Sequence, residues 1–194
     1  MANLIVISGP QAVGKMTVAQ SLKEKINYQL MTNHDSIEVS IKIFKSGTTA
    51  QKNLNKLIRE NVFNLAIENN INMIFTFVTA FDNQKDIEYL NNLKTKFENS
   101  GGNFYFVELK ASIEARLKRN ITPHRLKQKP SKNNIEWSNN ELISSSKEHK
   151  LNTETKETIF PNHIKINNEN LTPEEVTNII LKKLLDIAKK KHVN

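Results

Sequence analysis

A glycine-rich loop follows the first apolar run of this chain. The run from Leu4 to Ile7 is rich in β-branched residues, as in a strand that is buried within a parallel sheet. Gly9 and Gly14 follow it, Lys15 comes directly after the second glycine, and an amphipathic pattern begins there. A strand, a Gly-x-x-x-x-Gly-Lys loop and a helix, in that order, form the phosphate-binding loop (P-loop) of ATP- and GTP-binding proteins. This unit predicts an α/β fold.

Each residue type in this loop suits the binding of phosphate groups. A small residue at Gly9 lets the chain turn tightly away from the strand, and Gly14 lets the backbone approach a ligand closely. Successive loop N–H groups and the following helix N-terminus then face the anion, and Lys15 reaches the β- and γ-phosphates. A glycine turn that binds nothing is the alternative interpretation. The predicted nucleotide site consists of Gly9, Pro10, Gln11, Ala12, Val13, Gly14, Lys15, Met16 and Thr17.

One position departs from the usual P-loop pattern. The residue after the lysine is normally Ser or Thr, whose hydroxyl binds Mg²⁺, and here it is Met16. Thr17 comes one residue later and can offer a hydroxyl and an N–H group to the α-phosphate. Because Met16 carries no hydroxyl, we expect Mg²⁺ to be held by ATP oxygens, waters and a carboxylate from elsewhere. The sequence leaves that carboxylate unassigned.

Length and composition indicate one α/β domain over residues 1–194, with a sizeable core. The chain has no cysteine, which excludes disulfides and cysteine-bound metals. Because no apolar stretch approaches the length of a membrane span and no signal peptide precedes the first strand, we expect a cytoplasmic protein. The formal charge of +8 is compatible with nucleic acid, but much of the excess lies in lysines at the C-terminal helix end. A small-molecule acceptor is therefore favoured over nucleic acid.

Apolar periodicity alternates between strand and helix patterns along the chain. This alternation predicts a three-layer α/β/α fold with a five-stranded parallel sheet covered on both faces. The predicted strands are residues 3–8, 29–33, 73–78, 104–109 and 163–166. The predicted helices are residues 15–27, 35–45, 49–69, 87–97, 113–119 and 135–149, and a last helix after a Thr172–Glu175 capping box. Leu65 and Trp137 are predicted to face the core.

Polar residues follow the second and third predicted strands, where ligands of parallel sheets bind. Asn33, His34 and Asp35 follow the second strand, and Asp82 follows the third. Asp35 is the candidate base for an acceptor hydroxyl or a ligand of metal-bound water, and a helix N-cap is its competing role. Asn33, His34 and Asp82 are candidates for binding the acceptor. Asp82 is also a second candidate for binding the metal, and capping of the next helix explains it equally well.

Arginine is rare in this lysine-rich chain, and only Arg59, Arg116, Arg119 and Arg125 are present. The planar guanidinium suits contacts with transferring phosphates and stacking on a purine. Arg116 and Arg119 share one helix face at the start of the polar segment 120–134, which we predict to be a lid that closes over ATP. One of the two is expected to stack on adenine and the other to contact phosphate, and surface salt bridges are the alternative. Arg125, within the lid, is expected to add charge at the transferring phosphoryl group.

Several segments together resemble known P-loop kinases. These segments are Gly9 to Val18, Asn33-His34, Phe75 to Val78, Arg116 to Asn120, Lys129 to Lys132 and Trp137-Ser138. The chain resembles kinases of the shikimate and nucleoside-monophosphate type, and more narrowly a bacterial family of small ATP-binding proteins, AAA-type and often labelled shikimate kinase. The Gly-Lys-Met variant belongs to the pattern of that narrower family. The resemblance implies an ATP-dependent phosphotransferase, and it does not imply the acceptor.

The acceptor side departs from true shikimate kinases at three places. The Asp-x-Asp after the second strand is Asn33-His34-Asp35 here, the triple glycine after the third strand is Thr79-Ala80-Phe81, and the Arg-Pro-Leu-Leu of the lid is Arg125 to Gln128. We therefore expect a kinase scaffold whose acceptor is not shikimate. GTPase and AAA-motor motifs are absent from the sequence. The alternatives are an ATP-binding or RNA-linked protein without catalysis and a polynucleotide kinase.

Overall fold

The computed structural model describes residues 1–123, 126 and 134–193, of which 191–193 as backbone only. Its five strands form one parallel sheet in the order β2-β3-β1-β4-β5, so the predicted α/β/α fold is confirmed. The strands are β1 (Leu4–Ser8), β2 (Gln29–Met31), β3 (Met73–Phe77), β4 (Phe104–Lys110) and β5 (His163–Asn167). The helices are α1 (Lys15–Lys25), α2 (Asn33–Ile43), α3 (Thr49–Glu68), α4 (Gln84–Asn99), α5 (Ile113–Asn120), α7 (Ile135–Glu148) and α8 (Pro173–Val193).

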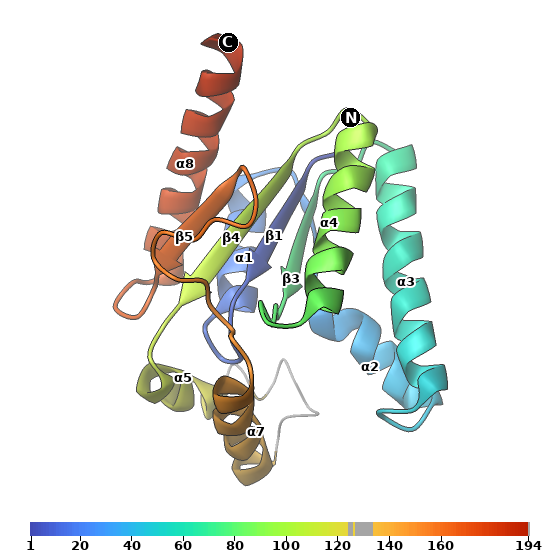
Figure 1. Ribbon diagram of the computed structural model, residues 1–194, viewed down its shortest axis with the longest axis vertical. Coiled ribbons are helices and arrows are strands. Elements are labelled where there is room, and N and C mark those ends of the chain that lie inside the picture. Colours follow the sequence, from blue (N-terminus) through green and yellow to red (C-terminus); the bar gives the residue numbers. More distant parts are fainter. Residues whose placement is uncertain (124–125, 127–133, 194) are drawn as a thin grey trace.

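The strand β1 lies at the centre of the sheet and brings the loops after three strands together. Ser8, its last residue, is opposite Phe77 of β3 on one side and Glu108 of β4 on the other. Because all pairings are parallel, the chain leaves these strands at the same edge of the sheet. The P-loop therefore lies between the segments that follow β3 and β4. In Figure 1, α2, α5 and α7 lie beyond this edge.

Two hydrophobic cores cover the two faces of the sheet. On one face, Phe63 of α3 packs edge-on against Phe75 of β3 and Phe97 of α4, at ring-centroid distances of 5.2 and 6.1 Å. On the other face, α1 and α8 pack on the alternate strand residues through buried side chains such as Leu22 and Ile180. The three central strands β1, β3 and β4 are thus buried on both sides, as strands between two helical layers are.

Two predicted core residues are exposed. Leu65 of α3 is 56% exposed, because Phe63 and Ala66 carry the face that packs on the sheet. Trp137 of α7 is 51% exposed, while Leu142 of the same helix is 1% exposed. The helix α7 lies beyond the sheet edge and packs against the short helix α5, so only part of its apolar surface finds a partner.

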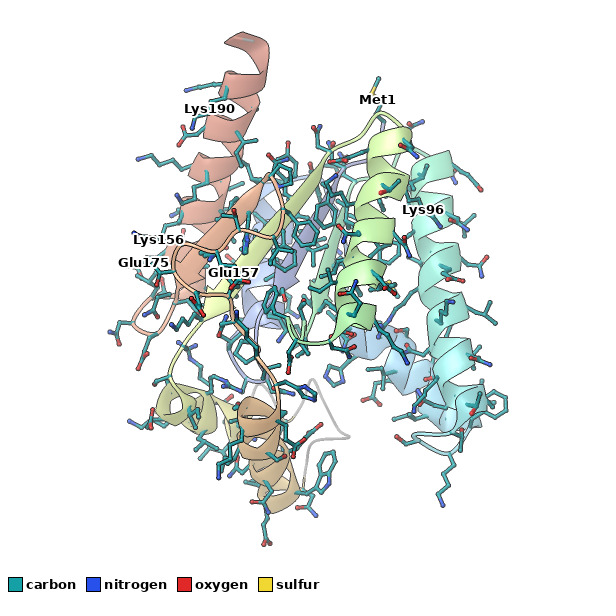
Figure 2. All side chains as sticks on the ribbon, viewed as in Figure 1. Met1, Lys96, Lys156, Glu157, Glu175 and Lys190 are labelled. Atoms are coloured by element: carbon teal, nitrogen blue, oxygen red, sulfur yellow. The ribbon has the colours of Figure 1, made fainter. Side chains whose placement is uncertain are left out.

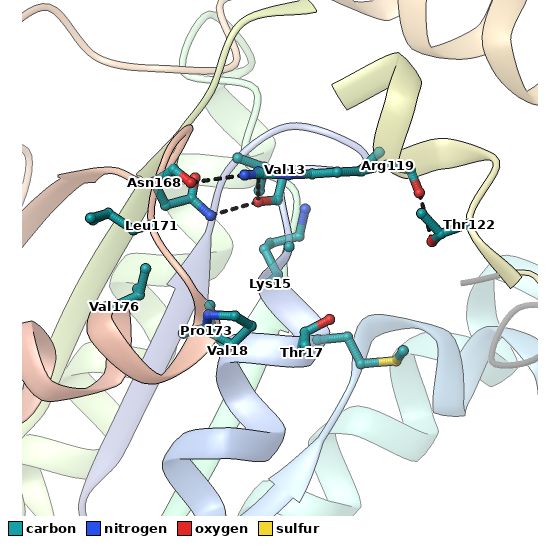
Figure 3. Close-up of a pocket in the computed structure, with 13 residues that line it drawn as sticks. Val13, Lys15, Thr17, Val18, Arg119, Thr122, Asn168, Leu171, Pro173 and Val176 are labelled. Atoms are coloured by element: carbon teal, nitrogen blue, oxygen red, sulfur yellow. Dashed lines mark hydrogen bonds between the residues drawn. The ribbon is translucent and has the colours of Figure 1, made fainter. Parts of the chain in front are cut away.

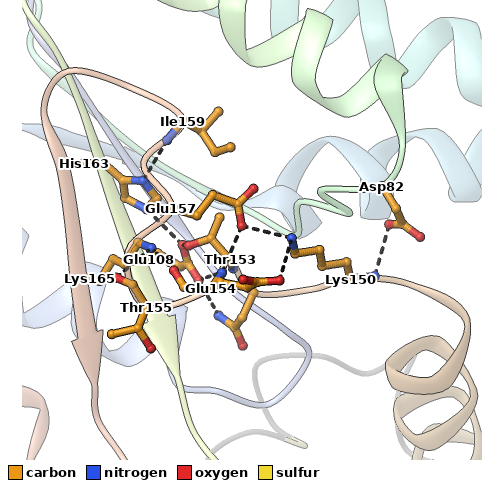
Figure 4. Close-up of polar contacts among 11 residues, drawn as sticks. Asp82, Glu108, Lys150, Thr153, Glu154, Thr155, Glu157, Ile159, His163 and Lys165 are labelled. Carbon is orange, nitrogen blue, oxygen red and sulfur yellow. Dashed lines mark hydrogen bonds and ion pairs between the residues drawn. The ribbon is translucent and has the colours of Figure 1, made fainter.

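The segment between α7 and β5 is attached to the sheet through Glu108 of β4 (Figure 4). The Glu108 carboxylate accepts hydrogen bonds from the Thr153 hydroxyl at 2.6 Å, the Thr153 amide at 2.8 Å and the Asn152 side chain at 2.9 Å. His163 Nδ1 accepts a hydrogen bond from the Ile159 amide, so its Nε2–H donates to Glu108 at 2.9 Å. These contacts fix the segment that connects α7 to the sheet.

The lysines and glutamates that are labelled in Figure 2 lie on the outside of the layers. Lys190 lies in the part of α8 that extends beyond the sheet, where the sequence places its lysine-rich helix end. At the start of α8, Thr172 and Glu175 form the predicted capping box, in which Glu175 N donates to Thr172 Oγ1 at 3.2 Å and Thr172 N donates to Glu175 Oε2 at 2.7 Å. Within the described residues, no helix is both long and apolar enough to cross a membrane.

Candidate functional site

The P-loop follows β1 and has the backbone geometry that its glycines allow. Gly9 has φ 140° and Gly14 has φ 106°, values that side-chain-bearing residues rarely adopt. A Cβ atom on Gly9 would lie 2.5 Å from the Leu109 carbonyl oxygen, so the loop passes close to the end of β4. The loop therefore needs glycine at Gly9 for space as well as for conformation.

The side chain of Lys15 lies inside the loop. Its ammonium donates hydrogen bonds to the carbonyl oxygens of Gly9 at 2.6 Å and Pro10 at 2.8 Å, and the residue is only 9% exposed. The first turn of α1 begins at this lysine. A cation beside a helix N-terminus creates a positive region of the kind that binds phosphates.

The first cavity, of about 210 Å³, lies on the α8 side of the loop (Figure 3). Its walls come from the P-loop, the start of α1, the end of α5 and the β5–α8 connection, and its lining residues are Ala12, Val13, Gly14, Lys15, Met16, Thr17, Val18, Arg119, Thr122, Asn168, Leu171, Pro173 and Val176. Figure 3 shows Lys15 between Val13 and Arg119 on one side and Thr17 on the other. Six of the nine predicted loop residues thus line one cavity.

Two side chains converge on the Val13 carbonyl at the wall of the first cavity. Arg119 Nη1 donates to it at 2.9 Å, and Asn168 Nδ2 donates at 2.8 Å. Arg119 Nη2 also donates to the carbonyls of Asn168 and Glu169, at 2.8 and 2.9 Å. Arg119 therefore links α5, the P-loop and the β5–α8 connection. Asn168 was identifiable from its place two residues after the last predicted strand, although its contact with Val13 was not.

Arg116 contacts the same loop from a buried position. It is 3% exposed, its Nε donates to the Gln11 carbonyl at 2.8 Å, and its Nη1 donates to Ser146 Oγ of α7 at 3.1 Å. Burial lowers the pKa of this guanidinium to about 10. The alternative of surface salt bridges does not hold for Arg116 or Arg119, since neither forms an ion pair within the described part of the chain. Arg125 lies outside the described residues, as does most of the predicted lid.

The second cavity, of about 230 Å³, lies on the α2 side of the loop. Its lining residues are Gln11, Ala12, Lys15, Met16, Asn33, His34, Ile37, Thr76, Val78 and Glu141. Asn33 and His34, which the sequence nominated for acceptor binding, are brought beside Lys15 here. Glu141 of α7 was not anticipated, because nothing in the sequence places α7 opposite the end of β3.

Arg59 of α3 holds the residues at the start of α2. Its Nη2 donates to Asn33 Oδ1 at 2.6 Å, and its Nε donates to Ser36 Oγ at 2.9 Å. The guanidinium lies 5.7 Å from the ring centroid of Phe75 and 5.9 Å from that of Phe77. Burial lowers the pKa of Arg59. The sequence showed that arginine is rare here, but it gave no signal that Arg59 would contact Asn33.

Asp35 caps α2 through its carboxylate. Thr32 is the N-cap residue, its amide donates to Asp35 Oδ2 at 2.7 Å, and its hydroxyl donates to Asp35 Oδ1 at 2.8 Å. Asp35 is thus the third residue of a capping box, and the helix N-cap itself is Thr32. It lines a third cavity next to Met16 and His34, and it is not among the lining residues of the second cavity. Its role as a base remains a prediction.

Asp82 lies apart from the cavities described here. Its carboxylate accepts a hydrogen bond from the Lys150 amide at 3.1 Å and lies 3.4 Å from His149 Nδ1. The N-cap of α4 is Asn83, whose side chain accepts from the Lys85 amide, so capping by Asp82 is corrected to capping by Asn83. Asp82 instead binds the segment that follows α7.

The described residues offer no built metal site. They contain no group of three or more His, Cys, Asp or Glu side chains that could hold a metal ion. Met16 presents a thioether where P-loops usually present a hydroxyl, and both Asp35 oxygens accept hydrogen bonds from Thr32. Because these residues supply few free oxygen ligands, they fit a Mg²⁺ ion that is bound mainly by nucleotide oxygens and water.

Comparison with known proteins identifies the fold. No protein-family model and no curated protein matches the sequence. The structure is similar to a gluconokinase from Sinorhizobium meliloti 1021, with 12% identity, a TM-score of 0.57 and coverage of 99% of this chain and 96% of that chain. It is also similar to shikimate kinase from Acinetobacter baumannii in complex with shikimate (18% identity, TM-score 0.57, coverage 96% and 94%) and to the Deinococcus radiodurans tunicamycin resistance protein (15%, 0.56, 95% and 96%). The chain has the fold of P-loop kinases.

Proposed function

We propose that this protein is an ATP-dependent phosphotransferase that acts on a small-molecule acceptor. The observation that carries the proposal is that Ala12, Lys15 and Met16 line both the first and the second cavity. ATP bound with its phosphates on the P-loop would extend its γ-phosphate to Lys15. An acceptor in the second cavity would then meet that phosphate from the opposite side, as in-line transfer requires.

The chain's own residues would act by positioning ATP and by neutralising the charge of its phosphate groups. Lys15 would hold the β- and γ-phosphate oxygens, and Thr17 would offer its hydroxyl to the α-phosphate. Arg119 would border the adenosine end of the first cavity, while Arg116 would hold the loop at the Gln11 carbonyl. Arg125 of the predicted lid would add charge at the γ-phosphate. Mg²⁺, carried by the nucleotide, would neutralise the charge of the phosphate oxygens.

An untargeted assay tests this proposal. The protein is incubated with Mg-ATP and a cell metabolite extract, and mass spectrometry follows compounds that gain one phosphoryl group. We expect such a compound with the unaltered protein and none with Lys15→Ala. Turnover that persists in Lys15→Ala, or ATP binding without any phosphorylated product, would contradict the proposal.

A non-catalytic ATP-binding or RNA-linked protein is the second candidate. Met16 favours it, because the usual hydroxyl ligand of Mg²⁺ is missing from the loop. Such a protein would bind ATP without turnover. A polynucleotide kinase would instead show turnover with a nucleic-acid acceptor and a steep dependence of binding on salt.

A further inference from the structure

Asn33 is the first residue of α2 and lines the second cavity. Its backbone N–H donates to Thr76 Oγ1 of β3 at 3.1 Å, and Thr76 is only 3% exposed. At the same helix start, Thr32 and Asp35 form the capping box. The backbone that carries the Asn33 side chain is therefore held by β3 and by the cap of α2.

The side-chain amide of Asn33 is held from behind the cavity wall. Arg59 Nη2 donates to Asn33 Oδ1 at 2.6 Å, which is a charge-assisted hydrogen bond. A guanidinium carries donors and no acceptor, so the amide oxygen is the atom that faces Arg59. Nδ2 is then the end of this amide that remains for a ligand in the cavity, and Nδ2 can only donate.

Arg59 is itself fixed, so the fold sets the orientation of Asn33. Its Nε donates to the buried Ser36 Oγ at 2.9 Å, and its guanidinium lies 5.7 and 5.9 Å from the ring centroids of Phe75 and Phe77. Arg59 is 9% exposed and is not among the described residues that line the second cavity. We therefore assign its effect on a ligand to its contact with Asn33.

The contact with Arg59 also makes Asn33 a better donor. When the amide oxygen accepts from a cation, electron density shifts away from Nδ2, as along other chains of hydrogen bonds. Because the amide is held before a ligand arrives, little side-chain entropy is lost on binding. Such a donor suits an oxygen with a free lone pair, and it does not suit an ammonium group, which only donates.

We propose that Arg59 is a positioning residue of the acceptor site, which turns Asn33 so that Nδ2 donates to an oxygen of the acceptor. A hydrogen bond to the attacking hydroxyl oxygen would lower its nucleophilicity, so we assign the contact to a second oxygen. This oxygen belongs to a hydroxyl, carbonyl or carboxylate group, since each of these has a free lone pair. The inference rests on the proposed phosphotransferase function and names a chemical group that its acceptor carries.

Replacement of Asn33 tests the contact. The probe is a dilution series of the cell metabolite extract with Mg-ATP, in which mass spectrometry follows the Lys15-dependent phosphorylated product. The series gives an apparent KM for the acceptor and a maximum rate. Asn33→Ala should raise this KM about three- to tenfold, because one hydrogen bond is lost, while the KM for ATP stays unchanged.

A double-mutant cycle tests the positioning role of Arg59. Arg59→Met keeps the length of the side chain and removes its donors, so the Asn33 amide can turn and the acceptor KM should rise by a similar factor. Added to Asn33→Ala, it should cause little further rise, because both changes remove the same contact. Lys52→Met, at an exposed position of α3, is the control and should change neither KM. Circular dichroism verifies folding, and Arg59→Lys replaces Arg59→Met in the cycle if that variant does not fold.

The possible results separate this inference from the proposed function. An unchanged acceptor KM in folded Asn33→Ala, or effects of Asn33→Ala and the Arg59 variant that add in full, would overturn the inference and leave the phosphotransferase function standing. An acceptor with ammonium groups and no oxygen besides the phosphorylated one would do the same. The absence of any Lys15-dependent product would overturn both.

Discussion

The guanidinium of Arg119 donates a hydrogen bond to the carbonyl of Val13 at 2.9 Å and thereby links α5 to the P-loop. The two residues are far apart in the sequence and meet at the wall of the first cavity. Asn168 donates to the same carbonyl, so the loop is held from two elements. The shape of the predicted phosphate site thus depends on residues outside the motif.

Replacement of Arg119 should weaken nucleotide binding. Arg119→Ala removes three hydrogen bonds to loop carbonyls, and we expect the Kd for ATP to rise about tenfold, since charge-assisted hydrogen bonds contribute about 1.5–3 kcal/mol. Isothermal titration calorimetry measures this change. Lys118→Ala, an exposed neighbour, is the control and should bind ATP normally. Equal affinity of Arg119→Ala and the unaltered protein would show that the loop keeps its shape without this residue.

Two variants of the α2 capping box separate the two roles of Asp35. Thr32→Ala and Asp35→Ala should each lower the free energy of unfolding by about 1 kcal/mol, because each removes one side of the box. Urea unfolding measures this loss. If Asp35 is also the base, Asp35→Asn should lower kcat by about a hundredfold or more, while Thr32→Ala keeps kcat near the unaltered value. A kcat near normal in Asp35→Asn would leave Asp35 with the capping role alone.

A hydroxyl at position 16 should create the missing magnesium ligand. In Met16→Ser, we expect the Kd for Mg-ATP to fall about tenfold, with no change in the Kd for ATP measured in EDTA. Calorimetry in the two buffers gives both values, so this test does not depend on catalysis. Met16→Ala removes the thioether without adding an oxygen and serves as the control. If Met16→Ala bound Mg-ATP as tightly as Met16→Ser, the cause would be removal of the large side chain and not metal binding.

The buried Glu108 should make the folded state sensitive to acid. Burial by itself would raise the pKa of Glu108, but hydrogen bonds from His163, Thr153 and Asn152 outweigh burial and hold the pKa at about 2, below the usual 4.5. Because the pKa is lower in the folded than in the unfolded state, Glu108 stabilises the fold above about pH 4.5, and this contribution is lost as the pH falls towards 2. A shift of this size corresponds to about 3 kcal/mol.

A Glu108→Gln variant isolates this contribution. It should unfold at lower urea concentration at pH 7 and should lose less stability than the unaltered protein between pH 5 and about pH 2.5. Glu114→Gln, at an exposed position of α5, is the control and should follow the unaltered curve. If the free energy of unfolding fell with pH by the same amount in Glu108→Gln and in the unaltered protein, other groups would cause the acid sensitivity.

Local sequence signals predicted the helices and strands of this fold, but they did not always predict which helix face is buried. The central strands are nearly continuous apolar runs and the glycine loop is a contiguous motif, so both could be recognised in the sequence. The Thr172–Glu175 capping box was found for the same reason. Leu65 and Trp137 were assigned to the core because apolar periodicity indicates a helix face without showing whether a partner covers it. Capping of α4 was offered as an alternative role for Asp82, but the cap is the next residue, Asn83, and both residue types cap helices.

The sequence alone determined the P-loop, the five-stranded α/β fold and the group of candidates around Lys15, because these depend on contiguous residues and on the rule that parallel strands end at one edge. Tertiary structure decided which distant side chains complete the site. Arg116 and Arg119 reach the loop carbonyls, Arg59 orients Asn33, and Glu141 borders the second cavity. Such contacts depend on how helices pack beyond the sheet edge, and no local pattern in the chain encodes that packing.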